Sequence, residues 1–283
     1  MKMEMIDLHT HSDCSDGTLS PEELVAYAVE KGLRALALTD HDTTAGLFRA
    51  RAAAKGTNLE IVSGIEFSTQ YRGKDIHIVG LDIKETLPEF TEQLCRFRKS
   101  RDLRNDKMIA KMQAYGFDIS REKMQTAFGE TVWTRAHFAR YLMDTGVVLE
   151  MKEAFDKYIG EGKPCFVPRE HVTPEQAVHL IAGCGGIAVL AHPMLYRLPE
   201  EQMRELLGSL KKAGLAGIEA IYSTHSQREE NLVRLLAKSY GLQISGGSDF
   251  HGDNKPAIDL GCGRGNLKIP YTVLANLRAG RRQ

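Results

Sequence analysis

The sequence predicts an α/β fold in which strands and helices alternate around a closed or nearly closed barrel. Apolar segments of strand length alternate with capped, helix-forming segments over most of the 283 residues. Such alternation favours a parallel sheet, and this many units favour a barrel. Histidine, aspartate and glutamate recur where the expected strands end, which is the edge where barrel enzymes gather their chemistry. The alternation is interrupted once, between about residues 88 and 168.

The composition excludes several classes of protein. Lysine plus arginine and aspartate plus glutamate both total 37, so no global field selects nucleic acid or membrane as a partner. There is no apolar run near 18 residues and no signal-peptide pattern at residues 1–5, so we expect a cytoplasmic protein without a membrane span. The five cysteines are scattered and form no C-x-x-C pair, which favours reduced thiols over disulfides or a thiolate zinc site.

The first expected strand, residues 6–12, contains His9 and His11. Side chains alternate along a strand, so both imidazoles point to the same side. Gly17 permits a turn through which Asp16 returns toward them. Two imidazoles and a carboxylate this close predict a divalent-metal site, and a strand end with two polar histidines is the alternative.

A helix and a second strand complete the first unit. Ser20, Pro21 and Glu23 form a capping box with proline at the first helical position. The strand expected at residues 33–38 then runs into a polar segment that contains His41. Both strands of this unit therefore end in histidine and aspartate.

The later elements repeat this unit, and several strands end at an ionisable residue. Before the interruption we expect a helix at 43–55, a strand at 59–66 that ends at Glu66, and a hairpin or return strand at 71–82 that contains His77. After the interruption we expect a helix that opens at Thr173, a strand at 186–191 before His192, and helices at 198–213 and 227–240. Two more strands are expected at 217–222 and 242–245, and the second is followed by Asp249 and His251.

The sequence pattern between about residues 88 and 168 predicts helices and no strand. A long charged helix is expected at 89–116, followed by helices around 121–128, 135–144 and 150–158. We expect residues 98–167 to be a helical insertion that forms the substrate cleft. Residues 1–97 and 168–283 then form the barrel with its metal cluster.

Nine nitrogen and oxygen donors stand at expected strand ends, and six of them are histidines. They are His9, His11, Asp16, His41, Glu66, His77, His192, Asp249 and His251. A single ion needs three or four protein ligands, so nine donors fit two or three divalent ions. Imidazole and carboxylate without thiolate favour manganese, with zinc or iron as alternatives, over calcium.

Three neighbouring residues have secondary roles in this interpretation. Asp7 and Asp40 adjoin donor histidines and are expected to orient their rings. Cys14 is either a further ligand or a spacer in the turn, and we favour the spacer. His77 lies in an apolar run, so a core histidine is its alternative interpretation.

Five motifs in order resemble the signatures of the polymerase-and-histidinol-phosphatase (PHP) family. They are Asp7-Leu8-His9-Thr10-His11, Thr39-Asp40-His41-Asp42, Gly64-Ile65-Glu66, Ala191-His192-Pro193 and Ser248-Asp249-Phe250-His251-Gly252. The resemblance implies a distorted seven-stranded β/α barrel that hydrolyses phosphoesters with bound metals. The chain is most similar to the branch of 3′,5′-nucleoside bisphosphate phosphatases and 5′-3′ exoribonucleases, in which the nine donors hold three metal ions.

Four residues are candidates for substrate contacts. In that branch the insertion carries an Arg-Pro-His triplet, which here is Arg135-Ala136-His137. Arg135 suits a bidentate phosphate contact, and His137 suits a hydrogen bond to phosphate or protonation of the leaving group. Both are candidate catalytic residues, with solvated helix residues as the alternative. Lys163, in a glycine-rich turn without P-loop spacing, and His225 are further candidates for substrate binding.

The expected function is metal-dependent hydrolysis of the 3′-phosphate of nucleoside 3′,5′-bisphosphates, with 5′-3′ exonuclease action on short RNA. Histidinol-phosphate hydrolysis is an alternative, and a non-catalytic, metal-stabilised binding module is another. The basic face of residues 96–111 is either solvated or steers a polyanion. We expect a nucleotide or short oligonucleotide as substrate and no stable protein partner.

Overall fold

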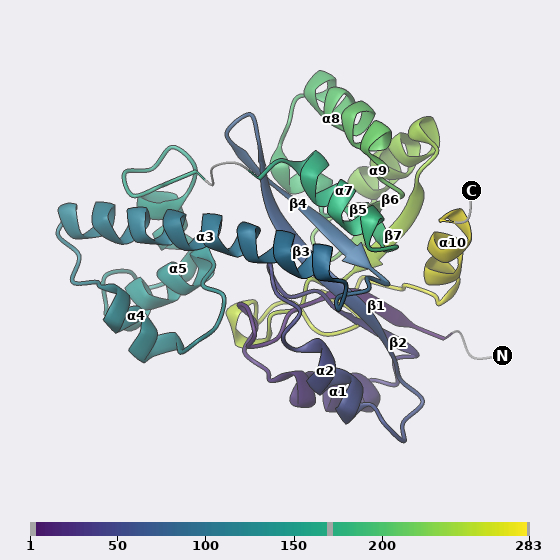
Figure 1. Ribbon diagram of the computed structural model, residues 1–283, viewed down its shortest axis with the longest axis horizontal. Helices are drawn as coiled ribbons and strands as arrows, with labels where there is room; N and C mark the ends of the chain where they lie inside the picture. Colours follow the sequence, from purple (N-terminus) through teal and green to yellow (C-terminus); the bar gives the residue numbers. More distant parts are fainter. Residues whose placement is uncertain (1–3, 169–171, 282–283) are drawn as a thin grey trace.

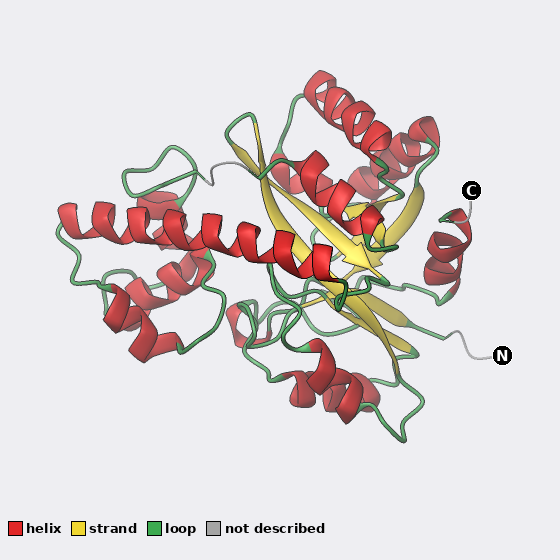
Figure 2. Ribbon diagram, viewed as in Figure 1, coloured by secondary structure: helices red, strands yellow, loops and turns green. Residues whose placement is uncertain are grey.

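The computed structural model describes residues 4–168 and 172–281. Its centre is a seven-stranded sheet (Figure 2). The strands lie side by side in sequence order. The strands are β1 (Ile6–Thr10), β2 (Ala35–Leu38), β3 (Glu60–Tyr71), β4 (Lys74–Leu81), β5 (Ile187–Leu190), β6 (Gly217–Tyr222) and β7 (Gln243–Gly247). The α/β class expected from the sequence is confirmed.

Strand β4 makes the sheet mixed, whereas the alternation alone favoured a parallel sheet. It runs antiparallel to both β3 and β5, and the other neighbours pair in parallel. The two-residue turn Arg72-Gly73 explains the reversal, because both residues have positive φ, at 52° and 80°. Such turns match the twist of a hairpin. This hairpin brings His77 to the same edge as the donors of the parallel strands.

The first and last strands meet and nearly close the barrel. The backbone N–H of Asp249 donates to the carbonyl of His9 at 2.8 Å, and that of His11 donates to Phe250 at 3.0 Å. The strands approach closely at Gly247, where a Cβ would lie 2.2 Å from the Cβ of His9. The two ends of the chain thereby bring their donors together.

Helices cover the barrel from outside (Figure 1). They are α1 (Pro21–Glu30), α2 (Leu47–Ala53), α7 (Pro174–Gly183), α8 (Glu200–Ala213), α9 (Gln227–Tyr240) and α10 (Thr272–Gly280). Alternate residues of β2 pack into two different hydrophobic clusters. Leu36 and Leu38 belong to the larger cluster, which includes the outer helices, and Ala35 and Ala37 belong to the second cluster. The expected bounds of β6 and α9 are confirmed, but α10 was missed.

Leu277 of α10 is fully buried in the second core cluster. We expect Leu277→Ala to destabilise the protein by about 2–5 kcal/mol, because it removes buried methyl groups and leaves a cavity. Urea unfolding followed by circular dichroism measures this loss. Asn276→Ala on the exposed face of the same helix is the control. Equal effects of the two substitutions would show that α10 does not anchor the core.

The interruption in the barrel is helical, with α3 (Pro88–Ala114), α4 (Arg121–Phe128), α5 (Arg135–Asp144), α6 (Met151–Ala154) and the π-helical turn η1 (Phe155–Ile159). Its first part packs Phe90 and Phe97 into the barrel core, whereas Met108 and Met112 belong to a separate cluster. The long helix α3 therefore connects the barrel to the helical insertion (Figure 1). A boundary at residue 98 falls inside this helix and stays a prediction.

Within the ranges that the structure describes, no helix combines the length and the apolarity that crossing a membrane requires.

Candidate metal centre

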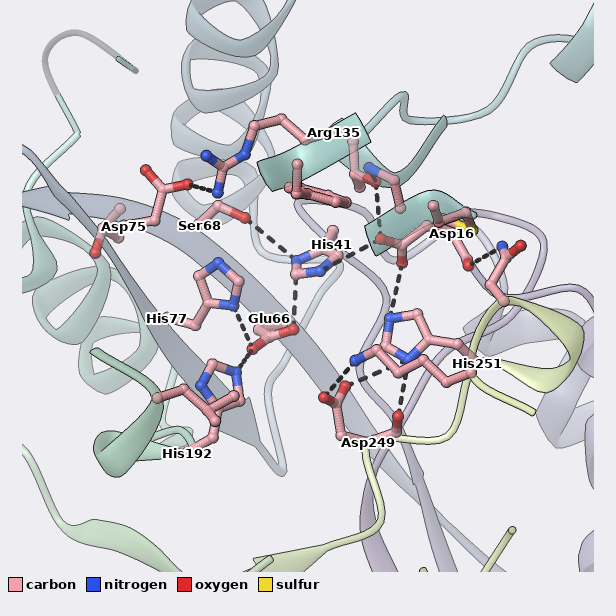
Figure 3. A pocket seen from close by; sticks show the side chains of 18 of the residues that line it. Asp16, His41, Glu66, Ser68, Asp75, His77, Arg135, His192, Asp249 and His251 are labelled. Atoms are coloured by element: carbon pink, nitrogen blue, oxygen red, sulfur yellow. Dashed lines mark hydrogen bonds and ion pairs between the residues drawn. The ribbon is translucent and has the colours of Figure 1, made fainter. Parts of the chain in front are cut away.

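All nine predicted donors converge on one end of the barrel. His9 and Glu66 lie on strands β1 and β3, and His77 lies on β4. The others follow directly after strands or stand in the adjoining loops. Figure 3 shows His77 and His192 pointing toward Glu66. Eight of the nine are buried, and the side chain of His77 is 21% exposed.

The donors form four groups in which one atom from each residue lies within 4.8 Å of the others. The groups are His11, Asp16, His41 and His251; His9, Glu66 and His192; His9, His11 and Asp249; and His41, Glu66 and His77. The groups share members, so neighbouring sites would share ligands. This arrangement can bind several divalent ions close together. Cys14 belongs to none of these groups, which leaves it as a spacer among the described residues.

Glu66 is the centre of the cluster. Its Oε2 lies 3.2 Å from Nε2 of His9 and 3.3 Å from Nε2 of His11. The same oxygen lies 3.3 Å from Nδ1 of His41. Its Oε1 lies 2.9 Å from Nδ1 of His77 and 3.2 Å from Nε2 of His192. One carboxylate therefore faces five imidazoles, which is a geometry suited to bridging ions.

Asp16 and Asp249 complete the carboxylate set. Asp16 Oδ1 lies 3.3 Å from Nε2 of His251. Asp249 Oδ1 lies 3.4 Å from Nε2 of His11 and 3.6 Å from Nε2 of His9. Asp249 has φ at +58° and His192 has φ at +24°, so the backbone is strained where these side chains are aimed. Such strain is frequent at functional sites.

The charges of the cluster are set by burial and by one another. Burial alone would raise the pKa of Glu66, but the surrounding imidazoles, His9 above all, hold it well below its usual value. Burial would lower the pKa of His11, but the nearby carboxylates of Asp249 and Glu66 raise it to about 9. Burial dominates at His41 and lowers its pKa to about 3. The carboxylates therefore stay ionised and attract positive charge into the buried site.

The residues fit divalent metal ions. Nε2 of His9, both ring nitrogens of His11 and Nδ1 of His192 have no hydrogen-bond partner among the described residues, although they are buried. Buried polar atoms normally have partners. Neutral imidazole and carboxylate are ligands that divalent transition metals prefer. Unpartnered imidazole nitrogens beside ionised carboxylates are what a metal centre requires.

Asp7 and Asp40 lie behind the cluster, and among the described residues their hydrogen bonds go to backbone N–H groups and serine hydroxyls. Asp7 accepts hydrogen bonds from the backbone N–H groups of Ser248 and Gly261, both at 2.9 Å. Asp40 accepts from the N–H and the hydroxyl of Ser12 at 2.8 and 2.6 Å. The role of both carboxylates in orienting histidine rings stays a prediction.

Glu219 was missed by the sequence reasoning. Its Oε1 lies 3.1 Å from Nδ1 of His9, and its Oε2 accepts the backbone N–H of His192 at 2.8 Å. A carboxylate on the outer nitrogen of a ligand histidine fixes the ring and its tautomer. The available signal was a single acid within the apolar strand β6.

We expect Glu219→Gln to lower kcat/KM by about 10–100-fold, because partners behind metal ligands typically contribute that much. The ring of His9 loses its charged partner while the fold keeps an isosteric side chain. Steady-state kinetics measures the loss. Glu201→Gln on the exposed face of α8 is the control. Activity equal to that of the control would assign Glu219 to packing alone.

A cavity of about 730 Å³ opens over the donors. Six cationic side chains line it, from the insertion and from the barrel: Arg101, Arg104, Arg135, Lys152, Arg197 and Lys255. Arg101 is buried, and it donates to Oδ2 of Asp42 at 2.8 Å and to the hydroxyl of Ser68 at 2.7 Å. The basic run on α3 is therefore divided, because Arg101 and Arg104 turn into the cavity while most of the run faces solvent. Such a cavity favours an anionic ligand.

The four predicted substrate residues differ in position. Arg135 lines the cavity and pairs with Oδ2 of Asp75 at 2.5 Å (Figure 3). His137 is buried, and its Nδ1 accepts the backbone N–H of Thr134 at 3.0 Å, so it caps α5. Burial lowers the pKa of His137 to about 4.

Lys163 and His225 do not line the cavity in the described part of the chain. Lys163 is exposed. His225 is buried, with Nδ1 3.0 Å from the carbonyl of Ala220 and its ring against Tyr222. The substrate contacts expected from both residues stay predictions.

The insertion also touches the donor set directly. The hydroxyl of Thr134, at the start of α5, donates to Oδ2 of Asp16 at 2.8 Å. The hydroxyl of Thr131 donates to the carbonyl of Asp13 at 2.8 Å. The insertion thus holds the loop that carries one of the donors.

Comparisons with known proteins place this chain among phosphoesterases. The family model described as the PHP domain matches residues 7–248. The chain is 39% identical to a 5′-3′ exoribonuclease from Haemophilus influenzae, over 87% of this chain and 89% of that protein. It is 38% identical to a 3′,5′-nucleoside bisphosphate phosphatase from Chromobacterium violaceum, over 92% and 91%. A solved Chromobacterium violaceum structure, described as an amidohydrolase with bound sulfate and no metal, matches with a TM-score of 0.87 and 36% identity over 97% and 96%.

Proposed function

The chain belongs to the PHP domain family and is a phosphoesterase, and from this premise we propose that it removes the 3′-phosphate of nucleoside 3′,5′-bisphosphates. We propose that the same site releases 5′-nucleotides stepwise from short RNA. The observation that supports this most is the junction of the nine-donor cluster with a cationic cavity. A cavity lined by six cationic side chains suits a substrate with more than one phosphate.

We propose that the nine donors hold three divalent ions, and that manganese is the ion used. Bound divalent ions would activate water and stabilise negative charge on phosphoryl oxygens. The donor set contains nitrogen and oxygen but no sulfur, which supports manganese over softer ions. Restoring chelator-treated protein with manganese, zinc or ferrous ion, and measuring bound metal as well as turnover, tests this choice. Full activity with zinc alone would overturn the assignment of manganese.

The chain's own residues aim the carboxylates. The ammonium of Lys255 and the hydroxyl of Tyr222 both donate to Oδ2 of Asp249 at 2.6 Å. Its Oδ1 is left facing the imidazoles. Burial would lower the pKa of Lys255, but the charge of Asp249 raises it, so the ammonium stays protonated at the cavity wall. Lys255 thus orients a metal donor and adds positive charge for an anion.

Arg135 is the residue that we assign to phosphate recognition. One terminal nitrogen of Arg135 pairs with Asp75. A guanidinium has further N–H donors in a planar fork, and these suit the oxygens of a phosphate. His137 supports it indirectly by capping the helix that Arg135 begins. We therefore propose that His137 positions Arg135, and that it does not protonate the leaving group.

Product analysis tests the proposed function. The purified protein is incubated with adenosine 3′,5′-bisphosphate, with a 5′-phosphorylated short oligoribonucleotide and with histidinol phosphate. The proposal expects adenosine 5′-monophosphate plus phosphate from the first and 5′-nucleotides from the second. Turnover of histidinol phosphate but of neither nucleotide substrate would overturn the proposal in favour of histidinol-phosphate hydrolysis. Tight nucleotide binding without any hydrolysis would indicate a binding module.

A further inference from the structure

One part of the cavity wall is apolar, and the chemistry at the metal centre does not use it. Its side chains are Ala136, Met151, Phe155 and Leu195. The first three belong to the insertion, and Leu195 belongs to the 3₁₀ turn η2 (Pro193–Tyr196) that follows β5. Leu195 leaves 50% of its surface exposed. The other three are partly buried, and apolar side chains that line a cavity beside polar groups are typical of a ligand-binding site.

Phe155 connects this wall to the phosphate-binding side. It is the first residue of the π-helical turn η1. Isolated π-helical turns are frequent at functional sites. The guanidinium of Arg135 lies 5.9 Å from the ring of Phe155 and 5.4 Å from the ring of Phe166. These distances suit cation–π contacts. The cation assigned to phosphate binding therefore lies over an aromatic ring that also lines the cavity.

We propose that the apolar wall is a subsite for the nucleobase, with Phe155 as the surface on which the base stacks. This inference rests on the proposed function, which supplies a substrate with a flat aromatic base. The cavity volume of about 730 Å³ lies in the range of small-molecule sites. Stacking on an aromatic ring strengthens nucleotide binding and tolerates every base, because every base has a π-face.

The chemistry of the wall sets the selectivity. Alanine, methionine, phenylalanine and leucine side chains offer no strong hydrogen-bond donor or acceptor to the edge of a base. The subsite therefore requires a base but does not distinguish one base from another. Adenosine and uridine bisphosphates are expected to have kcat/KM values within a few fold of each other.

A base-free substrate tests the subsite. Kinetics are compared for adenosine 3′,5′-bisphosphate, uridine 3′,5′-bisphosphate and ribose 3,5-bisphosphate. With the unaltered protein, we expect KM for the base-free compound to be about tenfold or more higher, with kcat little changed. Phe155→Ala is expected to raise KM for both nucleotides about tenfold more than for the base-free substrate, because the base-free substrate loses only the contribution that the contact between Phe155 and Arg135 makes to phosphate binding. Phe155→Leu, which retains packing against the insertion core, should show part of this effect.

Two further variants separate base stacking from other effects. Leu195→Ala alters the wall at an exposed position outside the core, and it should also raise KM for nucleotides only. Phe166 contacts Arg135 but does not line the cavity, so Phe166→Ala should affect all three substrates alike. Equal losses with and without a base in Phe155→Ala, or equal KM values in the unaltered protein, would overturn the subsite.

Binding measurements keep this inference separate from the proposed function. Calorimetry in the presence of chelator compares the affinities of adenosine 3′,5′-bisphosphate and ribose 3,5-bisphosphate for the unaltered and Phe155→Ala proteins. A base-dependent affinity that Phe155→Ala abolishes supports the subsite even if neither compound is hydrolysed, an outcome that would overturn the proposed reaction alone. Hydrolysis of both compounds without base-dependent binding would overturn the subsite alone.

Discussion

Replacement of Glu66 by glutamine is expected to lower kcat/KM on any phosphoester substrate by about 1,000-fold or more, which corresponds to about 4 kcal/mol of transition-state stabilisation. The two carboxylate oxygens lie within 3.3 Å of five imidazole nitrogens. An amide keeps the shape but removes the charge, and its NH₂ group cannot coordinate a metal. Two of the four donor groups lose a member at once.

Two measurements distinguish this effect from a loss of folding. Metal content after dialysis should fall in Glu66→Gln, while far-ultraviolet circular dichroism should remain that of the unaltered protein. Glu85→Gln is the matched control, because Glu85 is a partly buried acid that pairs with Arg51 outside the donor cluster. A Glu66→Gln protein that retains full metal content and activity would show that this carboxylate is not a ligand.

The convergence of the donors was predictable because most of them are marked locally. A histidine or acid at the end of an apolar segment is visible in the sequence, and the carboxyl ends of parallel strands meet at one edge of a barrel. His9 and Asp249 are distant in sequence, yet His9 lies in one strand that the pattern identified and Asp249 follows another. Their meeting therefore followed from the barrel topology, and it required no knowledge of side-chain packing.

The features that were missed depend on contacts between distant segments. The burial of Arg101 follows from where α3 lies against Asp42 and Ser68, and a helical charge pattern does not contain that information. The pairing of Arg135 with Asp75 is equally non-local. Helix α10 is short and has no side-chain cap hydrogen bond, so its local signal is weak and its place is set by the core.

The insertion contacts the candidate metal centre at two places. Arg101 reaches Ser68, whose hydroxyl lies 3.3 Å from Nδ1 of His41. Thr134 holds Asp16 from the opposite side of the insertion. Movement of the insertion would therefore shift two donors as well as the cationic wall. We therefore expect changes in the insertion to alter substrate recognition and metal binding together.

The closure of the barrel at Gly247 gives the second large effect. We expect Gly247→Ala to destabilise the protein by more than about 3 kcal/mol, beyond the usual range for overpacking. The added methyl group would lie 2.2 Å from Cβ, 2.7 Å from N and 2.9 Å from Cα of His9. Backbone atoms cannot rotate away as a flexible side chain can, so β7 must separate from β1. That separation moves Asp249 away from His9, and the donor set opens.

Urea unfolding and metal content measure the two consequences of Gly247→Ala. Gly183→Ala is the matched control, because Gly183 is an exposed residue at the end of α7 with open space around its Cβ position. Alanine favours the helix there by up to about 1 kcal/mol, so this control should be neutral or slightly stabilised. Gly247→Ala with unaltered stability and metal content would mean that β1 and β7 can separate without cost. The barrel's closure would then not be what holds the two ends of the donor set together.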